Sequence, residues 1–306
     1  MAEAAGAAVA RNNMAGMGWM FLSTLSFVAM HGSIAHIGQE LHPFEIAFFR
    51  NLFGFLTLTP LFLKFGFGPL KAKRPGLLSL RAVVNLAAML AYFTALTMAP
   101  LADVSALGFT APIFTTMLAV LLMGEKVGWR RAIAIAVGFL GAMIVIRPGF
   151  TVLETGHLLV LSSALLWAGA MIVIKMIART EPSLTITLYM GIMMTPLSLP
   201  FAIPVWTWPA AETWIWLVAI GALGGAGQWT MTEALKLGDT AVVMPVDFCK
   251  LIWAAVIGYI FLNQTPGVFT FVGGGVIFAA ALYIGLREAR TKTGSDKVQP
   301  TPGTPE

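Results

Sequence analysis

An acidic and a basic side chain lie three residues apart inside an apolar run in the last quarter of the chain. Asp247 and Lys250 would share one face of a helix there and could form an ion pair. If the run spans a membrane, ionisable groups within it are costly and mark substrate or ion pathways by default. We interpret the two residues as groups that meet a charged part of a substrate, with Asp247 also able to take up a proton. The alternative is a neutral structural ion pair that only holds the helix in place.

Other polar and aromatic side chains interrupt the apolar runs elsewhere. His31 is either a proton relay, because an unperturbed histidine has a pKa of about 6.5, or a hydrogen-bonded packing residue. Asn85 and Gln228 lie deep in their runs and would hydrogen-bond either a substrate or another helix. Four aromatic residues with polar tips also lie in such runs: Tyr92, Trp167, Tyr189 and Trp253. Trp167 lies near the middle of its run and suits stacking on a planar ligand.

Arg50 lies about two turns inside its apolar run, and an arginine is always charged, so it needs a partner. Asp103 and Glu45 are near the same predicted face and are the expected partners. We therefore expect these three residues to form an outer gate or a structural clamp and not a substrate ligand.

The composition explains why these charges stand out. The chain has 306 residues, of which 58% are hydrophobic and 11% charged, and its mean hydropathy is +0.83. A soluble domain would have about 25% charged residues. The net charge of +5 does not indicate a nucleic-acid partner, because the basic residues lie between apolar runs. The single cysteine excludes an internal disulfide, and no metal-ligand cluster is evident.

The apolar runs each contain about 18–24 residues, which suffices for a helix to cross a hydrocarbon core of about 30 Å. They predict ten transmembrane helices: Met14–Ile37, Phe44–Leu63, Leu77–Met98, Ala102–Met123, Trp129–Ile146, Gly156–Ala178, Leu184–Val205, Thr213–Leu235, Ala241–Leu262 and Val268–Leu286.

The basic residues predict the orientation of these spans. With the N-terminus inside, sixteen of the nineteen Lys and Arg fall on the cytoplasmic side, whereas the opposite side holds only Arg147. Both termini are therefore expected in the cytoplasm, which agrees with an even number of spans. The chain is expected to lie in the inner (cytoplasmic) membrane.

The two halves of the chain are related by a shift of 139 residues, which places Phe109 on Phe248. Each half would contain five spans, so the second half must be inverted. The basic loop Glu125–Arg131 and its uncharged counterpart Gln264–Thr270 agree with that inversion. We assign residues 1–13 to an N-terminal tail, 14–149 to the first repeat, 150–290 to the second repeat and 291–306 to a disordered tail.

Several motifs then resemble the EamA-type carriers of the drug/metabolite transporter superfamily. They are Pro112-Ile113-Phe114, the segment Leu121–Lys126 with its Gly-Glu turn, Gly138–Gly141 and Arg147-Pro148-Gly149. The second copy departs from this pattern at Asn263-Gln264. The stretches Gly16–Trp19 and His42–Arg50 are similar to the subgroup that contains S-adenosylmethionine uptake carriers.

Inverted repeats are a common construction of secondary transporters, with the substrate near the midplane between the halves. Architecture and resemblance together imply a non-enzymatic carrier without a cofactor, which moves a small organic metabolite such as S-adenosylmethionine or a similar compound. Export of amino acids or other metabolites and import of riboflavin are the alternatives within the family. Outside it, the alternatives are a membrane-embedded lipid-modifying enzyme and a structural membrane protein. The expected partners are the substrate and the bilayer, without nucleic acid, and the expected state is a monomer or homodimer.

Overall fold

The computed structural model describes residues 12–65, 72–124, 128–147, 154–177, 180–181, 183–238 and 240–296. Within these ranges the chain forms helices and short turns and contains no strand, which confirms the predicted all-α class for this part. The elements are α1 (Asn13–Ile37), α2 (Pro43–Phe65), α3 (Pro75–Met98), α4 (Leu101–Gly108), α5 (Ala111–Met123), α6 (Trp129–Ile146), α7 (Thr155–Ile177), α8 (Ser183–Ala202), η2 (Ile203–Val205), α9 (Ala211–Leu237), α10 (Thr240–Val243), η3 (Met244–Phe248), α11 (Cys249–Leu262) and α12 (Val268–Asp296).

Many of these helices are apolar enough to lie in a membrane. In the part of the chain that the structure describes, six helical segments are both long and apolar enough to cross one: Asn13–Ile37, Pro75–Met98, Leu101–Leu122 (α4 with α5), Thr155–Ile177, Met244–Leu262 (η3 with α11) and Val268–Leu286. Shorter apolar helices cover Ala132–Ile146 and Tyr189–Val205. The chain is therefore a multi-pass membrane protein.

Two of the expected spans are interrupted near their middle. The first interruption separates α4 from α5 at Phe109, and the second leads through η3 into α11 at Phe248. Pro112 lies in the first turn of α5 and Pro245 in η3, and proline removes a helical hydrogen bond because it has no N–H. The ring centroids of Phe109 and Phe248 are 5.9 Å apart, so the two interruptions face each other.

The two interrupted spans also end alike. α5 ends at Gly124 with φ 67°, and α11 ends at Asn263 with φ 52°. Glycine and asparagine are the residues that most readily adopt this left-handed conformation after a helix. Since these caps lie 139 positions apart, the local geometry follows the sequence repeat.

The first helix of each half packs against the third helix of the other half, so that α1 contacts α9 and α7 contacts α3. Ser23 donates a hydrogen bond to the Gly227 carbonyl (2.9 Å), and Ser163 donates one to the Ala88 carbonyl (2.7 Å). The two carbonyls lie 139 positions apart, whereas the two serines lie 140 apart. The expected shift of 139 residues therefore relates the third helices of the two halves, α3 and α9. The first helices, α1 and α7, are related by a shift of 140 residues.

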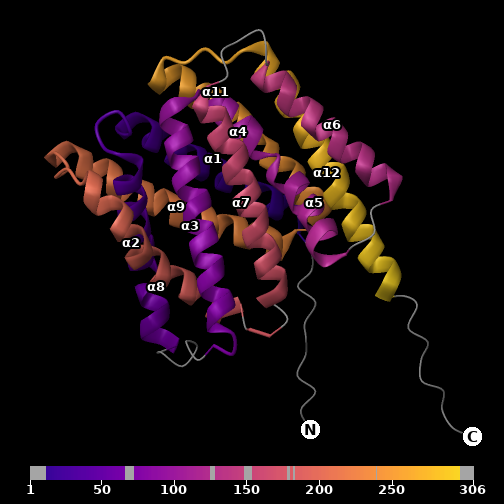
Figure 1. The fold of residues 1–306 in the computed structure, drawn as a ribbon, viewed down its shortest axis with the longest axis horizontal. Helices are drawn as coiled ribbons and strands as arrows, with labels where there is room; N and C mark the ends of the chain where they lie inside the picture. The colour runs from indigo at the N-terminus through magenta and orange to yellow at the C-terminus, as the bar shows by residue number, and fades with distance from the viewer. Residues whose placement is uncertain are drawn as a thin grey trace, which may run out of the picture.

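The other helices form the two flanks of the molecule. α6 and α12 lie side by side at one flank, and α2 and α8 lie at the opposite flank (Figure 1). A side chain at Gly273 of α12 would place its Cβ 2.6 Å from the carbonyl oxygen of Gly141 in α6, so only glycine permits this close approach.

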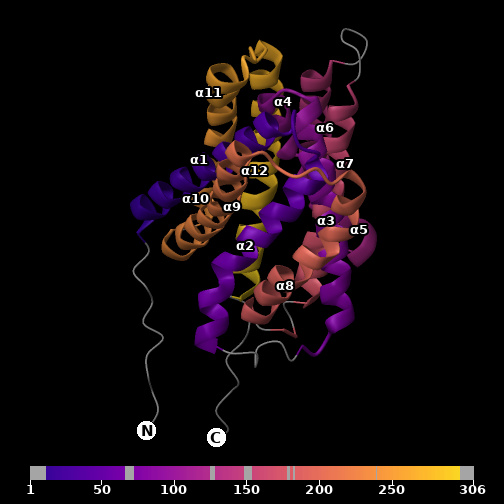
Figure 2. The same ribbon diagram turned by 90° about the vertical axis from the view of Figure 1, so that its left-hand side faces the viewer.

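Figure 2 turns the α2–α8 flank toward the viewer and shows α4 and α11, which contact each other, at the upper end of the bundle.

The C-terminal boundary differs from the expectation. α12 continues to Asp296, so residues 291–296, which were assigned to a disordered tail, are helical. Residues 297–306 and most of the expected N-terminal tail lie outside the described residues.

Candidate functional site

The predicted ion pair is present in the structure. Lys250 Nζ lies 2.6 Å from Asp247 Oδ1, and the two side chains are 24% and 18% exposed. Asp247 lies in η3 and Lys250 in the first turn of α11, so the interruption of this span positions both of them. The Lys250 ammonium also lies 5.3 Å from the ring centroid of Phe27 in α1. The pair is therefore oriented toward the helix of the other half that packs on α11.

Further polar side chains lie around this pair. The rings of His31 in α1 and Tyr92 in α3 have centroids 5.0 Å apart. His31 lies within electrostatic range of Lys250 and of Arg50 in α2, and Tyr92 lies within range of Asp247. We call these five residues the central cluster. It combines three helices of the first half with the interrupted span of the second half.

The central cluster differs from its apolar surroundings in exposure. All five of its side chains are half-buried. The neighbouring core residues Ile34, Leu107 and Leu251 are 0% exposed. A polar group that keeps some accessible surface inside such a core can contact a small molecule or an ion, because its hydrogen-bonding capacity is not used up by the protein.

Arg50 does not have the partners that we expected. Glu45 accepts hydrogen bonds from the backbone N–H and the hydroxyl of Thr207, both at 3.2 Å. Asp103 accepts its bonds from α7 and α12. Arg50 instead donates from Nη1 to the side-chain oxygen of Asn51 at 3.2 Å and has no carboxylate partner among the described residues. The expected clamp of three charges is therefore wrong, because Glu45 lies more than one helical turn from Arg50 and is held by the segment after α8.

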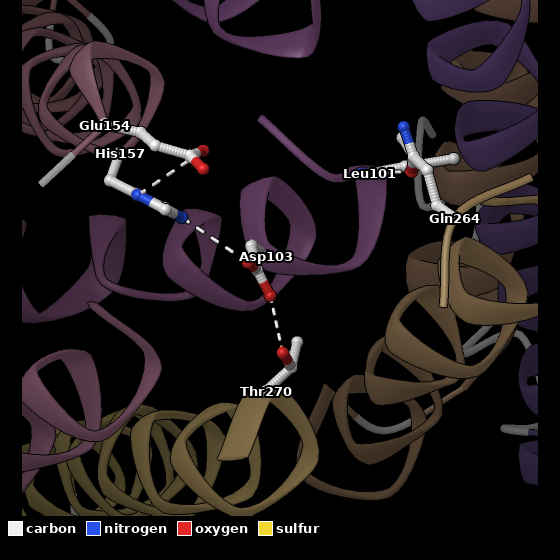
Figure 3. A network of polar contacts seen from close by, with 6 residues as sticks. All are labelled: Leu101, Asp103, Glu154, His157, Gln264 and Thr270. Atoms are coloured by element: carbon white, nitrogen blue, oxygen red, sulfur yellow. Dashed lines mark hydrogen bonds and ion pairs between the residues drawn. The ribbon is translucent and has the colours of Figure 1, made fainter. Parts of the chain in front are cut away.

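Asp103 belongs to a second polar network at the end of the bundle where α4, α7 and α12 begin (Figure 3). Its carboxylate accepts a hydrogen bond from the Thr270 hydroxyl at 2.5 Å and lies 3.4 Å from His157 Nε2. The other ring nitrogen of His157 is 4.0 Å from Glu154. We call these four residues the end network. It joins a helix of the first half to two helices of the second half.

A neighbouring contact strengthens the same end. The side-chain oxygen of Gln264, which precedes α12, accepts a hydrogen bond of 2.9 Å from the backbone N–H of Leu101 at the start of α4 (Figure 3). Sequence reasoning missed His157, Thr270 and Gln264 as members of one network. The sequence did contain a signal for this. Each of the three residues lies at or near the start of an apolar run, and the charge pattern places the starts of these runs on the same face of the membrane.

Trp167, the predicted stacking residue, is more exposed than its position on α7 suggests. It is 42% exposed, whereas Ser163, Ala164 and Ala170, which lie within one turn on the same face, are buried. Ser163 donates to α3, so this face is turned toward the interior of the bundle. The indole of Trp167 thus presents uncovered aromatic surface on an inward-facing side of α7.

The remaining predicted residues lie in different environments. The indole N–H of Trp253 is buried without a hydrogen-bond partner among the described residues, and its ring packs edge-on against Phe21 at 5.2 Å. The Asn85 amide donates to the sulfur of Met194 at 3.8 Å. Gln228 is exposed. Their roles in substrate binding stay predictions.

The sequence profile of the EamA-like transporter family matches residues 14–147 and again residues 154–286. The chain is 27% identical to an S-adenosylmethionine uptake transporter of Rickettsia prowazekii, over 93% of this chain and 97% of that protein. It is 29% identical to a riboflavin transporter of Brucella anthropi, with coverage of 80% and 89%. It is 26% identical to a pseudopaline exporter of Pseudomonas aeruginosa, with coverage of 89% and 95%.

Proposed function

Because the chain belongs to the EamA-like transporter family, we propose that it is a secondary transporter that moves a small organic metabolite across the inner membrane by alternating access. The observation that carries the proposal is the central cluster, in which half-buried charges of both halves meet beside two facing helix interruptions. Transporters commonly bind substrate at such interruptions near the midplane.

The proposed topology has ten transmembrane helices in two inverted repeats, residues 14–149 and 150–290, with both termini in the cytoplasm. The packing of α1 on α9 and of α7 on α3 supports this topology. In each case the first helix of one half contacts the third helix of the other half, so equivalent helices make equivalent contacts. In this orientation the end network lies at the outer face. Asp103 would then close the outer side, with Thr270 and His157 holding the halves together there.

The proposed substrate is S-adenosylmethionine or a similar nucleoside-like or amino-acid-like compound. The S-adenosylmethionine uptake transporter among the relatives covers nearly the whole chain, which supports this choice. Riboflavin import and export of a metabolite are the alternatives, and the riboflavin transporter and the pseudopaline exporter support them. Trp167 suits all three, because its uncovered indole can stack on a purine, a flavin or another planar group.

Counterflow in proteoliposomes tests the proposed function. Purified full-length protein is reconstituted and loaded with unlabelled S-adenosylmethionine, amino acids or riboflavin, and uptake of the labelled compound is followed. We expect transient accumulation of at least one compound, which Asp247→Asn abolishes and Glu233→Gln preserves. Glu233 is the matched control because it pairs with Lys236 at the same 2.6 Å and the same spacing, and its partner Lys236 is 62% exposed, whereas Lys250 is 24% exposed. If no compound of the panel accumulates or stabilises the protein, the proposal fails.

A further inference from the structure

We infer that Arg50 binds a carboxylate of the transported substrate, so that the substrate class is a carboxylate-bearing metabolite. This inference rests on the proposed function and reassigns Arg50 from gate to ligand. It follows from the partners, the charge balance and the surroundings of the Arg50 side chain.

The hydrogen bonds of Arg50 leave most of its capacity free. A guanidinium has five N–H donors, and among the described residues Arg50 uses only Nη1, which donates to Asn51. The side chain is half-buried, so its remaining donors keep access to the space around them. Asn51 in turn donates to the Met194 carbonyl at 3.5 Å, so the residue that positions Arg50 is itself held by α8.

The charges of the central cluster do not balance without a ligand. Asp247 and Lys250 neutralise each other at 2.6 Å, and the positive charge of Arg50 remains. The two carboxylates that could have compensated it, Glu45 and Asp103, are held elsewhere by Thr207 and by the end network. Arginine within a membrane span almost always pairs with an anion or a carbonyl group. A substrate carboxylate supplies that anion, and the planar guanidinium matches it with two parallel hydrogen bonds.

The second half of the protein packs close to the Arg50 guanidinium. A Cβ at Gly224 of α9 would lie 2.9 Å from the sulfur of Met30, 3.5 Å from Nε of Arg50 and 3.6 Å from Nη2 of Arg50. Because Gly224 has no side chain, α9 of the second half approaches Arg50 closely without adding a side chain of its own at this point. His31 lies within electrostatic range of both Arg50 and Lys250, so a substrate held by its carboxylate at Arg50 would extend past the His31–Tyr92 ring pair toward Asp247.

The test compares matched compounds that differ in the carboxylate. Full-length protein in proteoliposomes is assayed for counterflow of S-adenosylmethionine against decarboxylated S-adenosylmethionine, and of tryptophan and histidine against tryptamine and histamine. Wild-type protein should favour the carboxylate member of a transported pair by at least roughly 30-fold in kcat/KM. Arg50→Gln should reduce transport of that member by a similar factor, with a change below about 3-fold for its decarboxylated partner. Arg50→Lys should retain an intermediate preference, and Lys236→Gln is the control for loss of an exposed positive charge.

The outcomes separate the inference from the proposed function. Three outcomes would overturn the carboxylate assignment but not the proposed transport function. They are equal transport of both members of a pair, transport of riboflavin alone, and an equal loss of transport of both members in Arg50→Gln. If no compound moves, the proposed function fails and the inference fails with it. Gel filtration and thermal unfolding verify that each variant folds. Should Arg50→Gln not fold, the preference of the wild type together with Arg50→Lys decides the question.

Discussion

Phe109 and Phe248 occupy equivalent positions in the two halves and face each other with ring centroids 5.9 Å apart. Each ring also packs against Phe278 of α12, at 5.4 Å and 4.6 Å respectively. Both residues lie where a span is interrupted. The three rings therefore form an aromatic contact between the halves at the level where substrate is proposed to bind.

The two phenylalanines should be energetically coupled. We expect a coupling energy of about 0.5–1.5 kcal/mol in a double-mutant cycle of Phe109→Ala and Phe248→Ala, because the aromatic contact is lost with either change. Unfolding of the purified protein in detergent measures it. As a control, Phe109→Ala combined with Phe201→Ala should be additive, since Phe201 is 48% exposed on α8 at the opposite flank. Additivity of the first pair as well would show that the interruptions do not support each other.

The contact between α6 and α12 should tolerate no side chain at Gly273. Gly273→Ala is expected to cost about 1–3 kcal/mol of stability, because its Cβ would lie 2.6 Å from the Gly141 carbonyl oxygen. Gly285→Ala in the same helix meets nothing within 4 Å and should be neutral or stabilise by up to about 1 kcal/mol. Melting temperatures of both variants provide the comparison. Equal effects would mean that this flank is not closely packed in the membrane.

The end network should depend on Asp103 much more than on Glu154. Asp103→Asn replaces a charged acceptor of two contacts and should lower stability by about 1.5–3 kcal/mol. Glu154→Gln should change it by less than about 0.5 kcal/mol, because that side chain is 49% exposed and lies 4.0 Å from His157. Thermal unfolding at neutral pH measures both. A neutral Asp103→Asn would argue against any role of the network in holding the outer end closed.

The ion pairs Asp247–Lys250 and Glu233–Lys236 have the same spacing and distance, so comparing them should show whether Asp247 and Lys250 serve transport or only stability. Asp247→Asn leaves Lys250 without its partner inside the bundle, and we expect a loss of about 1–3 kcal/mol, below that of a fully buried pair. The double variant Asp247→Asn/Lys250→Met should recover part of that stability, because no unpaired charge is left, while counterflow stays absent. Glu233→Gln and Lys236→Gln should affect neither property. Recovered counterflow in the double variant would reduce the central pair to a structural role.

Hydropathy predicted the positions of the helices well, and every predicted apolar run overlies a helix or an interrupted helix. Pro112 and Pro245 indicated kinks in the two interrupted spans, because proline removes a helical hydrogen bond. Hydropathy averages over about twenty residues do not show where each helix breaks, so the exact positions at Phe109 and Phe248 were not predicted. The spacing of Asp247 and Lys250 was sufficient to predict their contact, because i and i+3 share a helix face. The partners of Arg50, Glu45 and Asp103 were not predictable in this way. They depend on which helices of different halves become neighbours, and the sequence distances between them, such as 162 residues for Glu45 and Thr207, carry no such information.

The hydrogen bond from Ser23 to Gly227 joins residues 204 positions apart. During synthesis α1 is made first, yet the helix that it packs against emerges only after two thirds of the chain has been translated. The face of α1 that packs on α9 therefore stays uncovered until the second half has been made. Membrane insertion of the spans must precede their final assembly, and quality control in the cell would meet the first half as an incomplete protein throughout that interval.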